Sequence, residues 1–141
     1  MEIQEARELT VDATVDNLDT VNQFVEDLLS TAECSMKTRM QVDLVVEEIF
    51  VNIASYAYAP GRGTAVIRGS LVEEPKGLEL IFMDEGKPYN PLERKDPDTS
   101  APLEERGIGG MGIFLVKKNV DAISYDYKDR RNILTIRKNI G

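Results

Sequence analysis

One stretch, SMKTRMQVDLVVEEIFVNIASYAYA at residues 35–59, constrains the fold of this chain more than any other. Its apolar residues recur every three or four positions, which is the spacing of one face of a helix. The sequence PGRG at 60–63 then breaks the pattern. We therefore predict a long helix that packs on a core through one apolar arc, formed by Val42, Val45, Val46, Ile49, Phe50, Ile53 and Tyr56.

Three polar side chains, Glu47, Glu48 and Asn52, interrupt this apolar segment. At about 100° per residue, Glu48 and Asn52 are neighbours at one margin of the arc, and Glu47 lies beyond the opposite margin. A carboxylate and an amide oxygen placed in this way can hold a hard cation such as Mg²⁺ and a water or hydroxyl. The alternative for this helix taken alone is an ordinary solvated edge.

The remaining segments predict a single domain, residues 1–141, in which helices and hairpins are segregated along the chain. This pattern is typical of an α+β two-layer sandwich, with a mixed, mostly antiparallel sheet and the helices on one face. A Pro-rich, charged loop of about twenty residues separates the two halves, and loops of this length are usually functional or disordered. In chain order we expect a strand at 4–13, helices at 14–32 and 35–59, strands at 64–74 and 78–86, a loop at 87–106, a helix at 113–121, and strands at 122–128 and 132–138.

Composition excludes several classes of function. The net charge of -8 argues against binding to nucleic acid or to an anionic membrane surface, because both rely on Lys and Arg. The chain has no histidine, which removes Ser-His-Asp chemistry and His-ligated zinc, and its single cysteine, Cys34, excludes a disulfide framework. The first ten residues are charged rather than apolar, and there is no long apolar run, so we expect a cytoplasmic protein without a membrane helix.

The motif MDEGKPY at 83–89 places Asp84 at the end of an apolar strand, with Gly86 two residues later. A carboxylate in this position can accept a hydrogen bond from an exocyclic amino group, and a glycine lets a flat ring approach the backbone. The alternative is an ordinary Asp-x-Gly turn. Taken alone, this motif does not distinguish the two.

The motif RGIGGMG at 106–112 has four glycines in six residues ahead of a predicted helix. Glycines expose backbone N–H groups, and a helix N-terminus adds more of them, so the two together can cradle phosphates. Arg106 at the start of the loop could pair with a terminal phosphate. The spacing matches neither a Walker A loop nor a Rossmann fingerprint. The alternative is a flexible hinge.

Taken together, EEIFVN, DEGKPY and GIGGMGIFLVKKNVD resemble the N, G1 and G2 boxes of the GHKL ATPases, the superfamily of histidine-kinase ATP-binding domains and gyrase-type topoisomerases. The order of elements and the ending D…Y…N-x-L-x-I-x-K most resemble the anti-sigma factor serine/threonine kinases. The resemblance covers nearly the whole chain.

This resemblance implies a Bergerat-type site for ATP and Mg²⁺. Asn52 would ligate Mg²⁺, and Glu48 would be the general base that accepts the proton of a seryl or threonyl hydroxyl. Asp84 would bind the adenine amino group, with Gly86 beneath the ring, and Arg106 would lie near the γ-phosphate. The phosphates would be wrapped by the loop glycines, Gly107, Gly109, Gly110 and Gly112.

The resemblance also implies a lid at 92–106, a homodimer, and partners that are proteins. These would be a STAS-domain antagonist and a sigma factor in a partner-switching system. The chain departs from the family at Tyr56, where many members have histidine. Two alternatives stay open: a module in which the nucleotide only gates protein binding, and an isolated histidine-kinase catalytic domain.

Overall fold

The structure is a computed structural model that describes residues 6–58, 61–73, 76–93 and 110–140. The order of helices and strands is the predicted one. A π-helical turn, Ile53–Ala57, continues the second helix, and short 3₁₀ turns lie at Val15–Asn17 and Pro91–Glu93. The main elements are β1 (Arg7–Asp12), α1 (Leu18–Leu29), α2 (Met36–Asn52), β2 (Thr64–Val72), β3 (Gly77–Asp84), α3 (Gly110–Asn119), β4 (Ala122–Lys128) and β5 (Arg131–Asn139).

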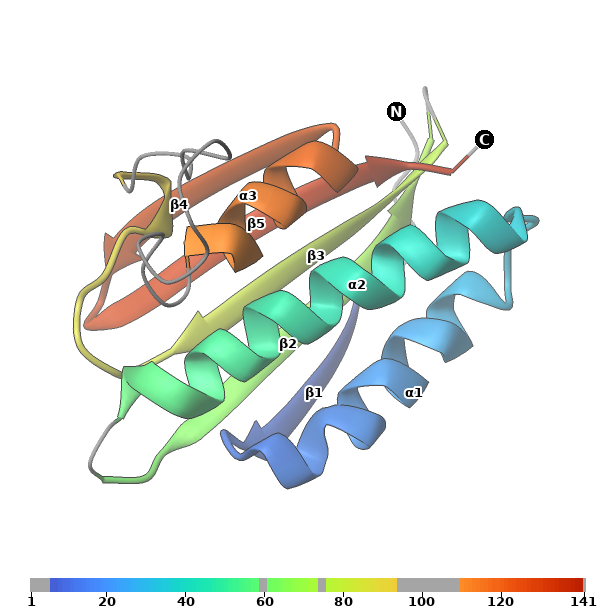
Figure 1. Ribbon diagram of the computed structural model, residues 1–141. Helices are drawn as coiled ribbons and strands as arrows, with labels where there is room; N and C mark the ends of the chain where they lie inside the picture. The colour runs from blue at the N-terminus through green and yellow to red at the C-terminus, as the bar shows by residue number, and fades with distance from the viewer. Residues whose placement is uncertain (1–5, 59–60, 74–75, 94–109, 141) are drawn as a thin grey trace.

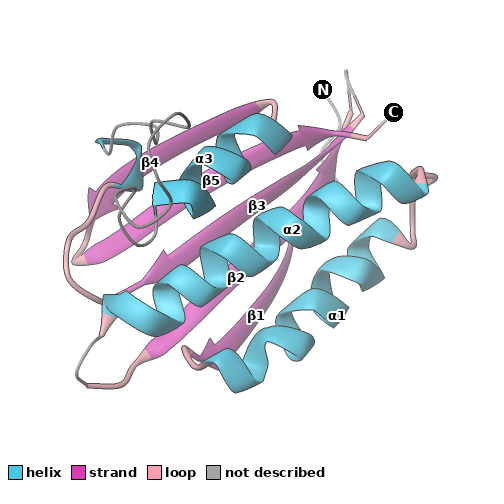
Figure 2. Ribbon diagram, viewed as in Figure 1, coloured by secondary structure: helices cyan, strands magenta, loops and turns pink. Residues whose placement is uncertain are grey.

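The five strands form one sheet in the order β1-β2-β3-β5-β4, and each neighbouring pair is antiparallel. The three helices lie together on one face of this sheet (Figures 1 and 2), so the predicted α+β two-layer sandwich is confirmed, with strand pairs that are all antiparallel among the described residues rather than mixed. Because β5 is inserted between β3 and β4, the end of β3 lies beside the start of β5. Asp84 and Asn132 are therefore direct partners in the β3–β5 ladder.

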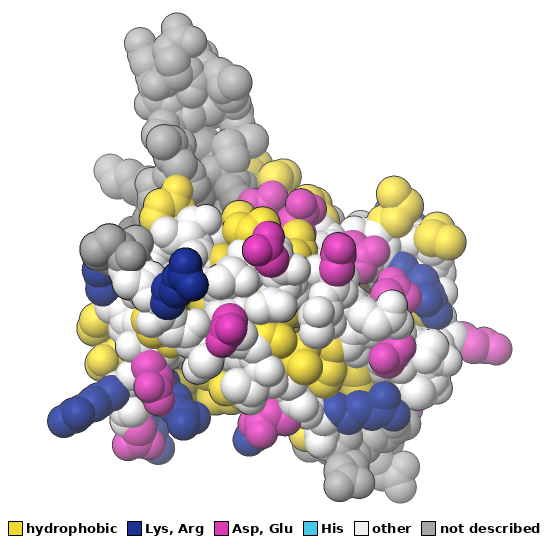
Figure 3. Space-filling view, turned by 90° about the horizontal axis from the view of Figure 1, so that it is seen from below, with side chains coloured by type: hydrophobic (Ala, Val, Ile, Leu, Met, Phe, Trp, Pro, Cys, Tyr) yellow, Lys and Arg dark blue, Asp and Glu magenta, His cyan; other side chains and the backbone are white. Residues whose placement is uncertain are grey.

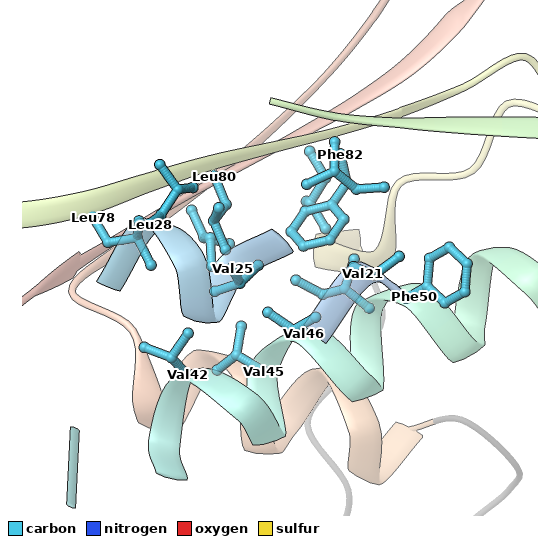
Figure 4. Close-up of a cluster of buried hydrophobic side chains, with 14 of the residues drawn as sticks. Val21, Val25, Leu28, Val42, Val45, Val46, Phe50, Leu78, Leu80 and Phe82 are labelled. Carbon is cyan, nitrogen blue, oxygen red and sulfur yellow. The ribbon is translucent and has the colours of Figure 1, made fainter. Parts of the chain in front are cut away.

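The core fills the space between α1, α2 and the central strands. Side chains from α1, α2 and β3 point toward one another in Figure 4, and several of them have no exposed surface. Burying an aliphatic or aromatic side chain of this size contributes about 1.5–3 kcal/mol. The helix layer is therefore held on the sheet by the apolar arc predicted for α2, with buried members Val42, Val45, Val46, Ile49, Phe50 and Ile53.

The prediction was wrong for one residue of the apolar arc, Tyr56. Tyr56 is 51% exposed rather than buried. The reason is the π-helical turn, in which hydrogen bonds run from i to i+5 and each residue advances by less than 100° around the axis. Residues beyond Ile53 therefore leave the phase of the α-helical arc. At its other end, α2 begins at an ordinary cap, where the Oγ of Ser35 accepts a hydrogen bond of 3.1 Å from the N–H of Thr38.

One face of the molecule carries charged side chains of both signs (Figure 3). On the face drawn in Figure 3, Lys and Arg side chains are interspersed with Asp and Glu side chains. Within the described ranges, no helix is both long enough and apolar enough to cross a membrane.

The β4–β5 hairpin turns through two residues with left-handed backbones, Asp129 (φ 54°) and Arg130 (φ 64°). Two consecutive positive φ angles are characteristic of a type I′ turn, which favours Asn-Gly. A non-glycine residue in this region costs roughly 1–2 kcal/mol.

We expect Arg130→Gly to raise the free energy of unfolding by about 0.5–1 kcal/mol, because the relief of this strain exceeds the entropy that glycine adds to the unfolded chain. Urea denaturation measures the change. Lys128→Gly is the control, since Lys128 lies in β4 without a positive φ, and there the same replacement should destabilise. Equal effects at the two positions would contradict the explanation.

Candidate functional site

A cavity of about 520 Å³ lies between the C-terminal end of α2, the segment after β3, α3 and the β4–β5 pair. This volume is in the range of small-molecule sites, which are mostly apolar with a few placed polar groups. The cavity follows that composition. It is lined by Ile49, Asn52, Ile53, Tyr56, Ala57, Lys87, Pro88, Tyr89, Pro91, Ile113, Tyr125, Asn132 and Leu134.

Asp84, predicted as a ligand-binding carboxylate, is the last residue of β3 and is only 7% exposed. Its Oδ1 accepts hydrogen bonds from the Nδ2 of Asn132 and the backbone N–H of Gly86, both at 2.9 Å. Burial raises the pKa of the Asp84 carboxyl, and these two hydrogen bonds oppose that rise by favouring the charged form. Asp84 is therefore a buried hydrogen-bond acceptor held in one orientation.

Asn132, which was not predicted as a site residue, joins Asp84 to the cavity. It is 7% exposed, lines the cavity, and donates a second hydrogen bond of 2.8 Å to the carbonyl oxygen of Lys87. Its Oδ1 accepts from the N–H of Tyr89 at 3.0 Å and from the hydroxyl of Tyr125. The sequence did carry one signal for it, because it opens the N-x-L-x-I-x-K pattern that places residues 132, 134 and 136 on one face of a strand.

Gly86 lies against the π-helical turn. A Cβ at this position would lie 2.2 Å from the carbonyl oxygen of Ala57, and the N–H of Lys87 donates to that same oxygen at 2.9 Å. Glycine is therefore required by the close approach of two protein segments. Its predicted place beneath a flat ring stays a prediction.

Tyr58 ties the end of the π-helical turn to the sheet. Its hydroxyl donates to the carbonyl oxygen of Thr64 at 2.6 Å and accepts from the N–H of Glu85 at 2.7 Å. Its ring packs so closely on Gly63 that a Cβ there would lie 2.2 Å from a ring carbon. Burial raises the pKa of the Tyr58 hydroxyl. The tyrosine thus remains a neutral hydroxyl that can make both hydrogen bonds.

The polar residues of α2 are placed differently from one another. Asn52, the last residue of α2, lines the cavity, whereas Glu48 is half-buried one turn earlier and is not among the described residues that line it. Glu47 is exposed. Their roles as metal ligand, base and bystander stay predictions.

The glycine loop is described only in part. Arg106, Gly107, Gly109 and all of the predicted lid beyond residue 93 lie outside the described residues. Gly110 and Gly112 fall within the first turn of α3, which begins earlier than the helix predicted at 113. The next residue, Ile113, lines the cavity. The start of α3 is therefore adjacent to the space that Asn52 and Asn132 border.

This arrangement suits a flat, mostly apolar ligand with a polar edge. Aliphatic and aromatic side chains supply the walls, and Asn132, which is hydrogen-bonded to Asp84, lies at one side. In the part of the chain that the structure describes, no three Cys, Asp or Glu side chains gather in a way that could hold a metal ion. Mg²⁺ would fit only with a single protein ligand such as Asn52 and further oxygens from phosphate and water, which is a common arrangement for this ion.

The chain is similar to known ATPase-domain and kinase sequences. Residues 11–138 match the family described as "Histidine kinase-like ATPase domain". The chain is 30% identical over 113 residues to the serine/threonine-protein kinase BtrW of Bordetella bronchiseptica, covering 80% of this chain and 79% of that protein.

Two solved structures share the fold. The RsbU and RsbW domains of a Mycobacterium tuberculosis protein superpose with a TM-score of 0.68 at 14% identity, over 97% of this chain. This chain spans only 33% of that structure's length. The histidine kinase domain of a blue-light activated kinase from Erythrobacter litoralis gives a TM-score of 0.55 at 13% identity, over 89% of this chain and 60% of its own.

We expect Gly86→Ala to lower the free energy of unfolding by about 1–3 kcal/mol, because the added methyl group would collide with the Ala57 backbone. Thermal and urea unfolding measure the loss. Gly61→Ala is the matched control, since its nearest neighbour would be 3.2 Å away and the residue is exposed. A Gly86→Ala variant as stable as Gly61→Ala would show that the two segments do not pack as described.

Proposed function

Because the chain belongs to the histidine kinase-like ATPase domain family, we propose that it is an ATP-dependent serine/threonine-protein kinase that acts as an anti-sigma factor. Its substrate would be a STAS-type antagonist in a partner-switching system. The observation that carries the proposal is the cavity in which Asn52, from the end of α2, and Asn132, bonded to Asp84, border the same space.

The residues of this site have the chemistry that the reaction needs. Phosphoryl transfer depends mainly on positioning and on neutralising charge, and it requires neither histidine nor covalent catalysis. Mg²⁺, when bound, would supply charge neutralisation at the phosphates. Asn52 would hold the ion through its amide oxygen, and Glu48 would take the proton from the substrate hydroxyl.

The remaining roles follow the same proposal. Asp84 would accept a hydrogen bond from the adenine amino group, and Gly86 would keep the backbone close to the ring. Arg106 would pair with the terminal phosphate. The phosphates would be bound by the backbone N–H groups of Gly107, Gly109, Gly110 and Gly112. Support comes from the position of Ile113 in the cavity wall, since this residue directly follows the last of these glycines.

The partners are proposed from the relatives. BtrW is named a serine/threonine-protein kinase, and one of the structures that share the fold contains an RsbW domain. We infer a STAS-domain antagonist as the phosphoryl acceptor and a sigma factor as the protein bound in alternation, with the chain acting as a cytoplasmic homodimer.

Transfer of labelled γ-phosphate from ATP to a STAS-domain protein of the same genome tests the proposal. We expect Glu48→Gln to lower the transfer rate at least about a hundredfold, since a general base typically contributes that much. Glu47→Gln is the matched control and should keep the wild-type rate, because Glu47 lies on the other side of the helix. If Glu48→Gln stayed within about tenfold of wild type, the base assignment would be wrong.

One observation favours the second function, a module in which the nucleotide only gates protein binding. Glu48 is not among the described residues that line the cavity. Tight binding of ATP and Mg²⁺ without transfer to any seryl or threonyl group would favour this function over the kinase.

A further inference from the structure

Two segments supply most of the residues that line the cavity. One is the end of α2 with its π-helical turn, at 49–57, and the other is the segment after β3, at 87–91. Neither segment belongs to the sheet. The hydrogen bond from the Lys87 N–H to the Ala57 carbonyl joins them directly at 2.9 Å. The shape of the cavity therefore depends on the contacts that hold these two segments together.

Tyr58 forms a second link between the two segments, although it is not among the described residues that line the cavity. It follows the π-helical turn, and its hydroxyl accepts a hydrogen bond of 2.7 Å from the N–H of Glu85. The same hydroxyl donates to the carbonyl oxygen of Thr64 at 2.6 Å. A hydroxyl has one proton, a carbonyl can only accept and an N–H can only donate, so the direction of both hydrogen bonds is fixed.

The Thr64 side of this link is a firm support. Thr64 opens β2, which is paired with β1, and the carbonyl oxygen of the preceding Gly63 accepts from the Ala13 N–H at 2.9 Å. The ring of Tyr58 packs directly on Gly63. Glu85, in contrast, lies just beyond the end of β3 and is exposed. The Tyr58 hydroxyl therefore carries support from the β1–β2 side of the sheet to the segment after β3.

We propose that Tyr58 is a positioning residue of the nucleotide site: its hydroxyl holds the segment after β3 in place against the end of α2 and so keeps the cavity in its binding shape. The proposal rests on the proposed nucleotide-binding function and adds to it a residue that lies behind the cavity wall. Without the hydroxyl, water can satisfy the exposed Glu85 N–H, so the fold persists. The bound nucleotide must then order the segment itself, and this cost weakens binding.

Tyr58→Phe removes the hydroxyl and leaves the ring on Gly63. We expect the affinity for Mg²⁺ and a non-hydrolysable ATP analogue, measured by calorimetry on the full chain, to fall about fivefold, which is the worth of one neutral hydrogen bond. Tyr127→Phe is the matched control. Tyr127 lies on β4, is 42% exposed, and its variant should keep the wild-type affinity.

Hydrogen exchange gives a readout that a merely structural role would not produce. In the free Tyr58→Phe protein we expect the backbone amides of Glu85 and Lys87 to exchange faster than in wild type, while those of Val45 and Val46 in the core of α2 keep their rates. Saturation with the ATP analogue should remove the difference. Faster exchange at all of these amides would indicate a general loss of stability and would overturn the inference.

Gly63→Ala tests the same link from the other side. A Cβ at Gly63 would lie 2.2 Å from a ring carbon of Tyr58, so the added methyl group must displace the ring and its hydroxyl, and no residue that lines the cavity is changed. Gly61→Ala is the control, because its Cβ would meet nothing closer than 3.2 Å. We expect Gly63→Ala to weaken binding of the analogue at least about fivefold. Combined with Tyr58→Phe, it should bind no more weakly than the weaker single variant, because both changes remove one link.

The outcomes separate the two proposals. Affinity that falls in Tyr58→Phe and stays at the wild-type value in Tyr127→Phe supports the inference. A folded Tyr58→Phe protein with wild-type affinity, or losses that multiply in the double variant, overturns it and leaves the nucleotide-binding function standing. Wild-type protein that binds no nucleotide overturns both. Circular dichroism establishes that each variant is folded, and Tyr58→Phe alone decides the question if Gly63→Ala is not.

Discussion

The contact between Ala57 and Gly86 is the constraint on which the rest of the site depends. It joins the π-helical end of α2 to the segment that follows β3, with the two backbones so close that no side chain fits between them. The hydrogen bond from Lys87 to the Ala57 carbonyl fixes the register of this contact. Through it, a helix that packs on the sheet by apolar burial also positions the polar side of the cavity.

The sheet supplies the second half of the site through its topology. Inserting β5 between β3 and β4 makes Asp84 and Asn132 ladder partners although they are 48 residues apart in the chain. Burying a carboxylate is costly unless it receives hydrogen bonds. Asn132 and the Gly86 N–H provide them, and the raised pKa of Asp84 shows that burial still outweighs their effect. A partly satisfied buried acceptor is suited to a ligand that brings a donor.

Much of the fold could be predicted from the sequence, because the spacing of apolar residues indicates directly which positions are buried. The arc of α2 from Val42 to Phe50, the hairpin signals and the order of elements depend on local pattern alone, and the structure confirms them. The predicted place of Tyr56 in the apolar arc was wrong because the prediction assumed α-helical geometry through a segment that adopts a π-helical turn. Such a turn depends on tertiary contacts, here those of Ala57 and Tyr58, and so leaves little trace in spacing.

Only part of the site could be predicted from the sequence, because the rest of it depends on tertiary contacts. Asn52 was found because it interrupts an apolar segment, and Asp84 because it ends an apolar strand two residues before a glycine. Asn132 stands at the start of a strand, and its importance comes from four hydrogen bonds to partners at positions 84, 87, 89 and 125. No local pattern encodes such a network. Its discovery required the strand order, which places β5 beside β3.

The central claim is that a purine nucleotide binds in the cavity with its polar edge at the Asp84–Asn132 pair. The most direct test is an NMR titration of ¹⁵N-labelled protein with Mg²⁺ and a non-hydrolysable ATP analogue. The account predicts that the side-chain amide of Asn132 and the backbone amides of Gly86 and Tyr89 shift together and saturate at one affinity. Saturable binding that leaves these three signals unchanged, with shifts gathered at the β1 edge of the sheet, would contradict it.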